Sequence, residues 1–317
     1  MKLLVTGGAG FIGSNFIRYW LKKYSKDKVI SLDKLTYAGN LSCDSNVVYK
    51  AIKGVDYVVH FAAETHVDRS IVNPNVFVRT NVMGTNVLLE ASIKHKIKRF
   101  HHISTDEVFG SLSLESKKKF SEKTKYFPRS VYAASKAASD HLVLAYFATY
   151  GLPVTITNSS NNFGPYQDPE KFIPRMITNL IDDKPVSIYG DGKNIRDWIY
   201  VMDHVRAIDI VLSKGRIGET YVLGGLTKDI NNLEVAVKLL NLFGKDKSFI
   251  KFVRDRKGHD RRYAIDWRKI KKEVGWEPEY NFETWIKKTV EWYRQNEWWW
   301  RPLKKRAEKL YEKTGQK

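Results

Sequence analysis

Short apolar runs alternate with longer amphipathic stretches along the first half of the chain. Residues 2–6 are apolar and β-prone, a glycine-rich turn follows them, and residues 11–24 have apolar side chains at helical spacing. The later apolar runs and helical patterns fall, in chain order, at 29–32, 56–63, 75–95, 99–104, 132–150 and 154–158. Buried strands that alternate with helices in this way predict an α/β fold with a doubly wound parallel sheet.

The second half of the chain is more irregular. Prolines divide residues 165–185 into short pieces, glycine-rich turns follow, and a helical pattern covers 232–243. We therefore expect a first domain over 1–163 and a smaller C-terminal α/β lobe over 164–317, with some later segments returning to the first domain.

One segment is too short for the usual arrangement of such a sheet. Residues 34–55 separate the second predicted strand from the next clear one at 57–61. A complete third strand needs a crossover on each side, and each parallel crossover takes about a dozen residues. We therefore expect the third strand, which would lie at the edge of the sheet, to be missing or reduced to Val47, Val48 and Tyr49.

The turn after the first predicted strand carries Gly7, Gly10 and Gly13. This spacing lets a strand turn tightly into a helix whose N-terminal amides face a diphosphate. Asp33 ends the next strand about 20 residues later, where a carboxylate accepts the ribose hydroxyls of adenosine. The pattern predicts a Rossmann-like domain that binds NAD rather than NADP, although the neighbouring Lys34 weakens this preference. A glycine-rich turn without a ligand is the alternative.

Tyr132 and Lys136 are four residues apart and therefore lie on one face of the predicted helix. A lysine in this position lowers the pKa of the tyrosine and can bind the nicotinamide ribose. The tyrosinate then removes a hydroxyl proton as hydride leaves the carbon. Such a pair is also common on helix surfaces, and the glycine motif upstream is what favours the catalytic interpretation.

These motifs, with Asn81 between them, resemble the extended short-chain dehydrogenase/reductases. Longer segments resemble one family within that group, the dTDP-glucose 4,6-dehydratases, and the resemblance runs from residue 1 to about 300. The segments that carry it are 33–40, 61–70, 104–110, 160–167, 196–201 and 255–263. The resemblance implies an enzyme that uses bound NAD⁺ to convert a nucleoside-diphosphate glucose into its 4-keto-6-deoxy sugar.

The adjacent acids Asp106 and Glu107 separate dehydration from oxidation or epimerisation, which need no such pair. In the mechanism that the resemblance implies, Tyr132 takes the 4-hydroxyl proton as hydride passes to NAD⁺, and Thr105 binds the 4-oxygen. Glu107 then removes the C5 proton, protonated Asp106 donates to the leaving 6-hydroxyl, and hydride returns to C6. Asp106 must have a raised pKa, to which the charge of Glu107 contributes. Two surface carboxylates are the alternative.

The resemblance assigns three groups of site residues and no metal. The expected catalytic residues are Thr105, Asp106, Glu107, Tyr132 and Lys136. The expected NAD-binding residues are Gly7, Gly10, Phe11, Ile12, Gly13, Asp33, Lys34, Leu35, Thr36, Ala62, Ala63, Thr80, Tyr132, Lys136 and Asn162. The expected substrate-binding residues are Thr65, His66, Thr105, Asn161, Lys171, Phe172, Ser187, Ile188, Tyr189, Arg196, Asn232, Arg256 and His259.

The chain departs from the family pattern in two places. Lys257 replaces the proline of the family's Asp-Arg-Pro-Gly-His loop, which leaves the choice between thymidine and uridine nucleotides open. The Asp-Ile or Asp-Val pair with which the family holds the adenine is absent from the short segment 34–55. We expect NAD⁺ to be held less tightly as a result.

Composition indicates which partners and which cellular compartment to expect. The net charge of +19 suggests nucleic acid as a partner, but no RNA- or DNA-binding motif accompanies it, and a basic surface that attracts an anionic substrate explains it better. The basic tail 301–317 carries part of this surplus. A single cysteine, Cys43, and an N-terminus that becomes glycine-rich too early for a signal peptide predict a cytoplasmic protein. No stretch is apolar enough to cross a membrane.

Two alternatives to dehydration stay open: a related nucleotide-sugar epimerase or decarboxylase, and a catalytically silent relative that acts as a binding protein. The resemblance also implies a homodimer in which helices 75–95 and 131–150 pair. The outward apolar residues that we expect to form this interface are Val76, Val87, Leu88, Leu142 and Tyr146.

Overall fold

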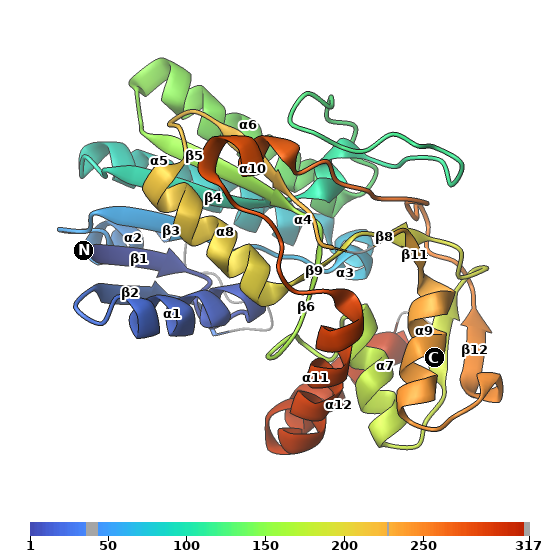
Figure 1. The fold of residues 1–317 in the computed structure, drawn as a ribbon. Helices are drawn as coiled ribbons and strands as arrows, with labels where there is room; N and C mark the ends of the chain where they lie inside the picture. The colour runs from blue at the N-terminus through green and yellow to red at the C-terminus, as the bar shows by residue number, and fades with distance from the viewer. Residues whose placement is uncertain (36–43, 227, 314–317) are drawn as a thin grey trace.

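Six strands form a parallel sheet in the order β10-β5-β4-β3-β1-β2 (Figure 1). The structure, a computed structural model, describes residues 1–35, 44–226 and 228–313. The sheet strands are β1 (Lys2–Thr6), β2 (Lys28–Leu32), β3 (Tyr57–His60), β4 (Arg99–Thr105), β5 (Val154–Ser159) and β10 (Thr220–Leu223). Their apolar side chains are buried on both faces, as a parallel sheet between helices requires. The predicted Rossmann-like architecture is confirmed.

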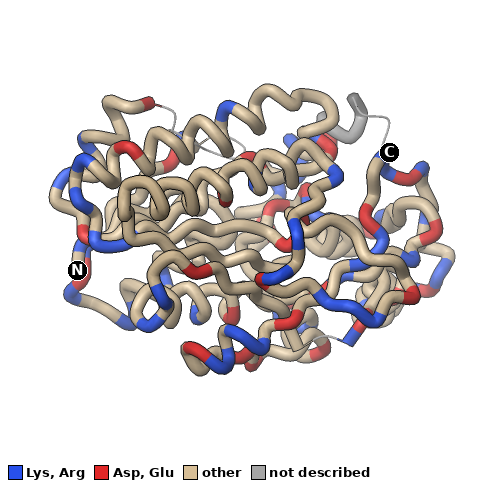
Figure 2. The backbone as a smooth tube through the Cα atoms, turned by 90° about the horizontal axis from the view of Figure 1, so that it is seen from above, with Lys and Arg blue, Asp and Glu red and all other residues tan. Residues whose placement is uncertain are grey.

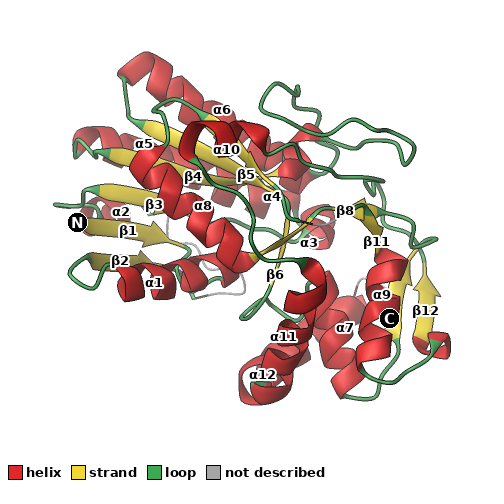
Figure 3. Ribbon diagram, viewed as in Figure 1, coloured by secondary structure: helices red, strands yellow, loops and turns green. Residues whose placement is uncertain are grey.

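Helices cover both faces of this sheet (Figures 1 and 3). One layer contains α1 and α8, whose Phe16 and Val205 pack with Leu3 of β1. The other layer contains α2, α5 and α6, whose Val48, Leu88 and Val143 share a core with the opposite side of the strands. These helices are α1 (Phe11–Lys23), α2 (Ser45–Ala51), α5 (Gly84–Lys94), α6 (Val131–Tyr150) and α8 (Val201–Lys214).

The helix expected over 75–95 contains a π-helical turn. It runs through α4 (Pro74–Phe77), η1 (Val78–Met83) and α5. The π turn contains Asn81, whose side chain accepts from the backbone nitrogen of Glu64 and donates to Ser135 Oγ, both at 2.8 Å. Asn81 thereby links the loop after β3 to α6. Single π turns inside helices are frequent at functional sites.

The proposed remnant of a third strand is wrong. Val47, Val48 and Tyr49 lie in α2, which Asp44 caps by accepting from the backbone nitrogen of Val47. Val48 and Ile52 are fully buried and stand four apart, which is helical rather than strand spacing. Within the described residues β2 is the edge of the sheet. Residues 36–43 lie outside them, so the absence of a third strand stays a prediction.

The second lobe has its own core. Buried side chains of α7, α9 and α11 gather there with Trp300 of α12. Its helices are α7 (Phe172–Ile181), α9 (Asn232–Leu242), α11 (Phe282–Gln295) and α12 (Glu297–Lys313). Its strands pair as β6 (Asn161–Phe163) with β9 (Trp198–Tyr200), β7 (Val186–Tyr189) with β12 (Ile250–Val253), and β8 (Ile195–Arg196) with β11 (Ile230–Asn231). Between these segments, α8, β10 and α10 (Arg268–Val274) pack with the large sheet.

Helices α4 to α6 carry apolar side chains on their outer faces. Leu88 is not among them: it is fully buried against the sheet, so its predicted outward position is wrong. Val87, Leu142 and Tyr146 are half-buried at the rim of the same core. The large apolar residues of these helices that are exposed are Val76, Val78, Met83, Val131, Phe147 and Tyr150.

Lysine and arginine are spread along the whole backbone and interspersed with acidic residues (Figure 2). This distribution favours a generally basic surface over a single nucleic-acid-binding face. None of the helices in the described ranges has the length and apolar character that a membrane crossing requires.

Candidate active site

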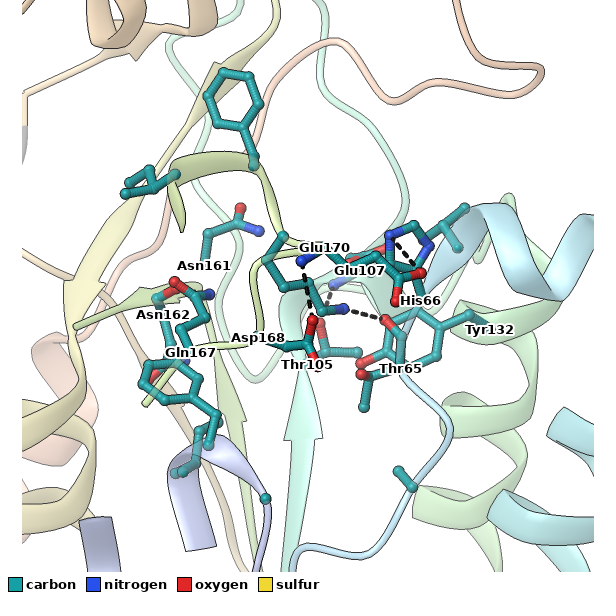
Figure 4. A pocket seen from close by; sticks show the side chains of 18 of the residues that line it. Thr65, His66, Thr105, Glu107, Tyr132, Asn161, Asn162, Gln167, Asp168 and Glu170 are labelled. Atoms are coloured by element: carbon teal, nitrogen blue, oxygen red, sulfur yellow. Dashed lines mark hydrogen bonds and ion pairs between the residues drawn. The ribbon is translucent and has the colours of Figure 1, made fainter. Parts of the chain in front are cut away.

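A cavity of about 640 Å³ opens at the carboxyl ends of the parallel strands, where the second lobe faces them. Doubly wound proteins bind ligands in this crevice because loops that follow neighbouring strands diverge there. The turn after β1, the ends of β3 and β4, and second-lobe side chains such as Arg196 and Arg256 line the cavity. In Figure 4, Thr65 and His66 after β3, Thr105 at the end of β4 and Tyr132 lie around one space.

Two glycines of the first turn lie so close to neighbouring backbone atoms that no side chain fits at either position. Gly7 has a φ of 70°, and a Cβ at this position would lie 2.7 Å from the backbone nitrogen of Ala62. A Cβ at Gly13 would lie 2.3 Å from the carbonyl oxygen of Gly7. Gly10 is the N-cap of α1 and gives it no side-chain cap, so the amides of the first helical turn are open to an anion. The turn fits the diphosphate of a dinucleotide.

Asp33, at the end of β2, completes this part of the cavity. Its carboxylate accepts from the backbone nitrogens of Ala9 and Leu35, both at 2.9 Å. These bonds fix the carboxylate beside the glycine turn, where it can accept ribose hydroxyls. Lys34 is exposed and does not line the cavity. Thr36, also expected to bind the cofactor, lies outside the described residues.

The tyrosine and lysine lie on the first turns of α6, where Ser130 caps the helix by accepting from the backbone nitrogen of Ala133. Tyr132 is hydrogen-bonded to Thr105 at the end of β4. Lys136 is buried and donates to the carbonyl oxygen of Ile103 at 2.8 Å. Burial lowers the pKa of Lys136 to about 8.

The pKa of Tyr132 is raised, against expectation. Burial is the main cause, the charge of Glu107 adds to it, and the hydrogen bond with Thr105 opposes it. The phenol therefore needs a further positive charge to act as a base, and an oxidised nicotinamide ring carries one.

Asp106 and Glu107 lie on the short helix η2 (Asp106–Phe109), where Thr105 Oγ1 accepts from the backbone nitrogen of Glu107. Asp106 is 1% exposed, and burial together with the charge of Glu107 raises its pKa well above the usual range. Burial also raises the pKa of Glu107, but Arg196 and Arg256 oppose that shift. The expected raised pKa of Asp106 is confirmed, and the two neighbours have unequal acidity.

Arginines of the second lobe stand over the acidic pair. Arg256 donates from Nε and Nη2 to the two carboxylate oxygens of Asp68, at 2.7 and 2.9 Å. Arg196 donates to the carbonyl oxygen of Asp260 at 2.9 Å. Lys171 donates to the carbonyl oxygen of Thr65 at 2.8 Å. The fixed guanidinium groups suit a diphosphate, since planar donors bind its oxygens in pairs.

Two expected substrate histidines have acidic partners. The Nε2 atom of His66 lies 3.3 Å from Glu170 Oε1, and Glu170 also binds the guanidinium of Arg69 through both oxygens. His66 is nevertheless neutral, because burial lowers its pKa well below the usual range. His259 Nδ1 lies 2.7 Å from Asp255, and burial lowers the pKa of His259 to about 4.

Most of the predicted site residues line the cavity, but two more do not. Ile188 is fully buried in the second-lobe core, because side chains alternate along β7 and only Ser187 and Tyr189 face the cavity. Thr80 is buried within η1 behind the site. In the described ranges, no three His, Cys, Asp or Glu side chains are grouped as metal ligands would be.

Sequence reasoning missed part of the lining. Asp68 and Glu170 line the cavity, and neither is among the expected site residues. The sequence analysis assigns no site role to the basic C-terminal segment, yet α12 contributes to the wall of the cavity. Its cavity residues have helical spacing, a signal that the sequence contained: Trp299, Leu303 and Arg306.

The fold and the site together define a class of protein. A glycine-rich turn with an acidic edge residue fits a nicotinamide dinucleotide, a Tyr–Lys pair faces the same cavity, and a second lobe supplies cationic groups. These features belong to Rossmann-like enzymes with dehydrogenase-type chemistry on a polar, anionic substrate.

Comparison with known proteins specifies the family. The family model described as GDP-mannose 4,6 dehydratase matches residues 4–289. The dTDP-glucose 4,6-dehydratase of Mycolicibacterium smegmatis is 46% identical over 100% of both chains, and that of Escherichia coli is 47% identical over 94% of each. A solved dTDP-glucose 4,6-dehydratase, DesIV of Streptomyces venezuelae with NAD and TYD bound, is 46% identical with a TM-score of 0.92, covering 96% of this chain and 100% of that one. The chain belongs to the dTDP-glucose 4,6-dehydratase family.

The glycine turn gives a first prediction about cofactor binding. A Cβ at Gly13 would meet the carbonyl of Gly7 at 2.3 Å, whereas one at Gly10 would meet it at 3.2 Å. Gly13→Ala must therefore displace the backbone of the turn, and we expect it to weaken NAD⁺ binding about tenfold or more. Titration calorimetry with NAD⁺ measures this, and Gly10→Ala is the matched control with a smaller expected loss. Equal affinities in both variants would contradict the assignment.

Proposed function

We propose that the protein removes water from dTDP-glucose to form the 4-keto-6-deoxy sugar nucleotide, with NAD as its cofactor. The observation that carries this proposal is the pair of adjacent carboxyl groups of unequal acidity, Asp106 and Glu107, beside Tyr132 and Thr105. Oxidation and epimerisation at C4 need no second acid and base, whereas elimination across C5 and C6 does.

The cofactor is held by the glycine turn, Asp33 and Lys136. When bound, NAD⁺ supplies a hydride acceptor that later returns the hydride, so no net oxidation results. Tyr132 takes the proton from the 4-hydroxyl, and Thr105 orients the 4-oxygen through a hydrogen bond. The carbonyl formed at C4 acidifies the hydrogen at C5.

Elimination then uses the two carboxyl groups in different roles. Glu107 removes the C5 proton, and its ionised form is favoured by Arg196 and Arg256. Asp106 keeps its proton at neutral pH because it is buried beside Glu107, and it donates that proton to the departing 6-hydroxyl. Water leaves, and C5 is reprotonated from Glu107.

The second lobe binds the nucleotide in this proposal. Arg196, Arg256 and Lys171 line the cavity and supply the positive charges that neutralise the diphosphate. Phe172, Ser187, Tyr189 and Asn232 line the same cavity and form the nucleoside pocket. Structures of relatives solved with NAD and a second ligand bound support a site that holds both a cofactor and a substrate.

Two further inferences concern assembly and compartment. We infer a homodimer, because α4 to α6 leave an apolar face exposed that pairing of these helices would bury. The single cysteine leaves no partner for an intramolecular disulfide, which supports a reducing compartment such as the cytoplasm.

Glu107→Gln tests the mechanism directly. This variant keeps the first proton transfer to Tyr132 but removes the base for C5, so we expect bound NADH to accumulate and product formation to fall about 100-fold or more. Rapid mixing with dTDP-glucose, read by NADH absorbance and by mass spectrometry of the sugar nucleotide, measures both. Tyr132→Phe is the matched control, in which no NADH forms. Turnover of Glu107→Gln to the 4-keto-6-deoxy product, or formation of a C4 epimer by the unaltered protein, would refute the proposal.

The dimer is tested by a charge on its expected interface. Met83 is 60% exposed on η1, and Met83→Asp places a carboxylate there without disturbing the core. We expect the unaltered protein to be dimeric by light scattering and the variant to dissociate at micromolar concentration. Trp298→Asp is the control, since Trp298 is also exposed but lies on α12. A monomeric unaltered protein would refute the inference.

A further inference from the structure

A chain of buried polar side chains lies behind the active-site lysine. Tyr132, Lys136 and Asp140 are spaced four residues apart on α6 and face β4. Lys136 is 3% exposed and Asp140 is 0% exposed. An ammonium group removed from water to this degree needs a nearby opposite charge, because an unpaired buried charge is strongly unfavourable.

His102 of β4 stands between the two charged groups. Its Nε2 atom lies 3.2 Å from Lys136 Nζ and 3.3 Å from Asp140 Oδ1. His102 is fully buried, and burial lowers its pKa to about 4, so the ring is neutral. A neutral ring nitrogen carries either a proton or a lone pair. A lone pair on Nε2 accepts from an ammonium at Lys136, whereas a proton on Nε2 would point at Asp140 and exclude that ammonium.

Asp140 is held as a carboxylate by its surroundings. Its Oδ2 atom accepts from Ser104 Oγ at 2.8 Å, Tyr126 Oη at 2.9 Å and Asn158 Nδ2 at 3.1 Å. Burial opposes ionisation of Asp140, but opposing interactions, among them those with Lys136 and Ser104, outweigh it and lower its pKa. Three donors on one oxygen are typical of a permanent buried anion.

The other titratable groups around Lys136 are neutral. They are Tyr132 on its own helix, His60 on β3 and His102 on β4; burial raises the pKa of Tyr132 and lowers that of each histidine. Asp106 and Glu107 of η2 lie beside Tyr132 instead. Among the described residues, Asp140 is thus the group whose charge offsets the burial of Lys136.

We propose that Asp140 and His102 are positioning residues for Lys136: Asp140 supplies the buried counter-charge that keeps Lys136 protonated, and the Nε2 lone pair of His102 fixes the ammonium in place. The inference rests on the proposed function, in which Lys136 helps to hold NAD beside Tyr132.

Competitive labelling with acetic anhydride, followed by mass spectrometry, measures the pKa of Lys136 itself in protein without substrate. We expect a pKa of about 8 in the unaltered protein. Asp140→Asn should lower it by about one or more, because a neighbouring opposite charge shifts a pKa by roughly this much. Asp56→Asn is the matched control, since it removes a carboxylate that pairs with the exposed Lys98 and should leave Lys136 unchanged.

Two substitutions of His102 distinguish a specific effect on the ammonium of Lys136 from a general disturbance of the fold. The amide of glutamine can accept from Lys136 and donate to Asp140, so His102→Gln should keep the pKa of Lys136 close to that of the unaltered protein. His102→Leu has no acceptor and should lower the pKa. If Asp140→Asn does not fold, Tyr126→Phe, which removes one donor from the carboxylate, should lower the pKa of Lys136 by a smaller amount.

Enzyme assays add a second readout. Activity that needs a protonated Lys136 is lost as pH rises through its pKa, so the alkaline limb of the kcat profile should move to lower pH in Asp140→Asn and stay in place in Asp56→Asn. An unchanged pKa of Lys136 in Asp140→Asn, or an equal change in Asp56→Asn, would overturn the inference. Labelling needs no turnover, so it measures the pKa of Lys136 even if the protein does not dehydrate dTDP-glucose. A failure of the proposed function can therefore be distinguished from a failure of this inference.

Discussion

Burial of the carboxyl end of β4 away from solvent is the constraint on which the rest of the site depends. Burial is the largest influence on the acidity of Asp106, Glu107, Tyr132 and Lys136 alike. It makes carboxyl and phenol groups weaker acids and the ammonium a stronger one, so the pKa values of the two carboxyl groups and of Lys136 move toward the neutral range, whereas that of Tyr132 moves away from it. The parallel sheet produces this burial, because a strand with helices on both faces ends in a crevice that a second lobe can close.

The second lobe closes the crevice through ion pairs that cross to the first. Asp68 and Arg69 of α3 (Val67–Val72) bind Arg256 and Glu170 respectively, each through two contacts. Removing one partner of such a pair leaves a buried charge uncompensated, which is far costlier than losing a surface pair. The guanidinium of Arg256, which lines the cavity, is therefore oriented by a carboxylate from the other lobe. If Arg256 binds the nucleotide as proposed, recognition and closure of the site depend on the same contacts.

Local periodicity in the sequence was enough to predict five of the six strands of the sheet, the glycine turn and the Tyr–Lys pair, because each depends on neighbours within one or two elements. The edge strand β10 was not among the predicted strands. Most other errors concern the face of an element on which a residue lies. Ile188 and Leu88 were assigned to the wrong side of a strand and a helix, and Val47–Tyr49 are β-branched or aromatic residues that form a helix because their burial has helical spacing. The roles of Glu170 and Asp140 could not be predicted, since their partners on other elements come close only in the folded chain.

The geometry of a 3₁₀ turn explains how two adjacent acids acquire opposite roles. Successive residues of such a helix point about 120° apart, so neighbours in sequence face different surroundings. Asp106 turns into the protein, where its Oδ2 atom has no hydrogen-bond partner among the described residues and burial favours the protonated form. Glu107 turns toward Arg196 and Arg256, which favour the ionised form. Thr105 fixes the turn by capping it, and its hydroxyl is also bonded to Tyr132. In the proposed function, one short helix thus separates an acid from a base while both line the same cavity.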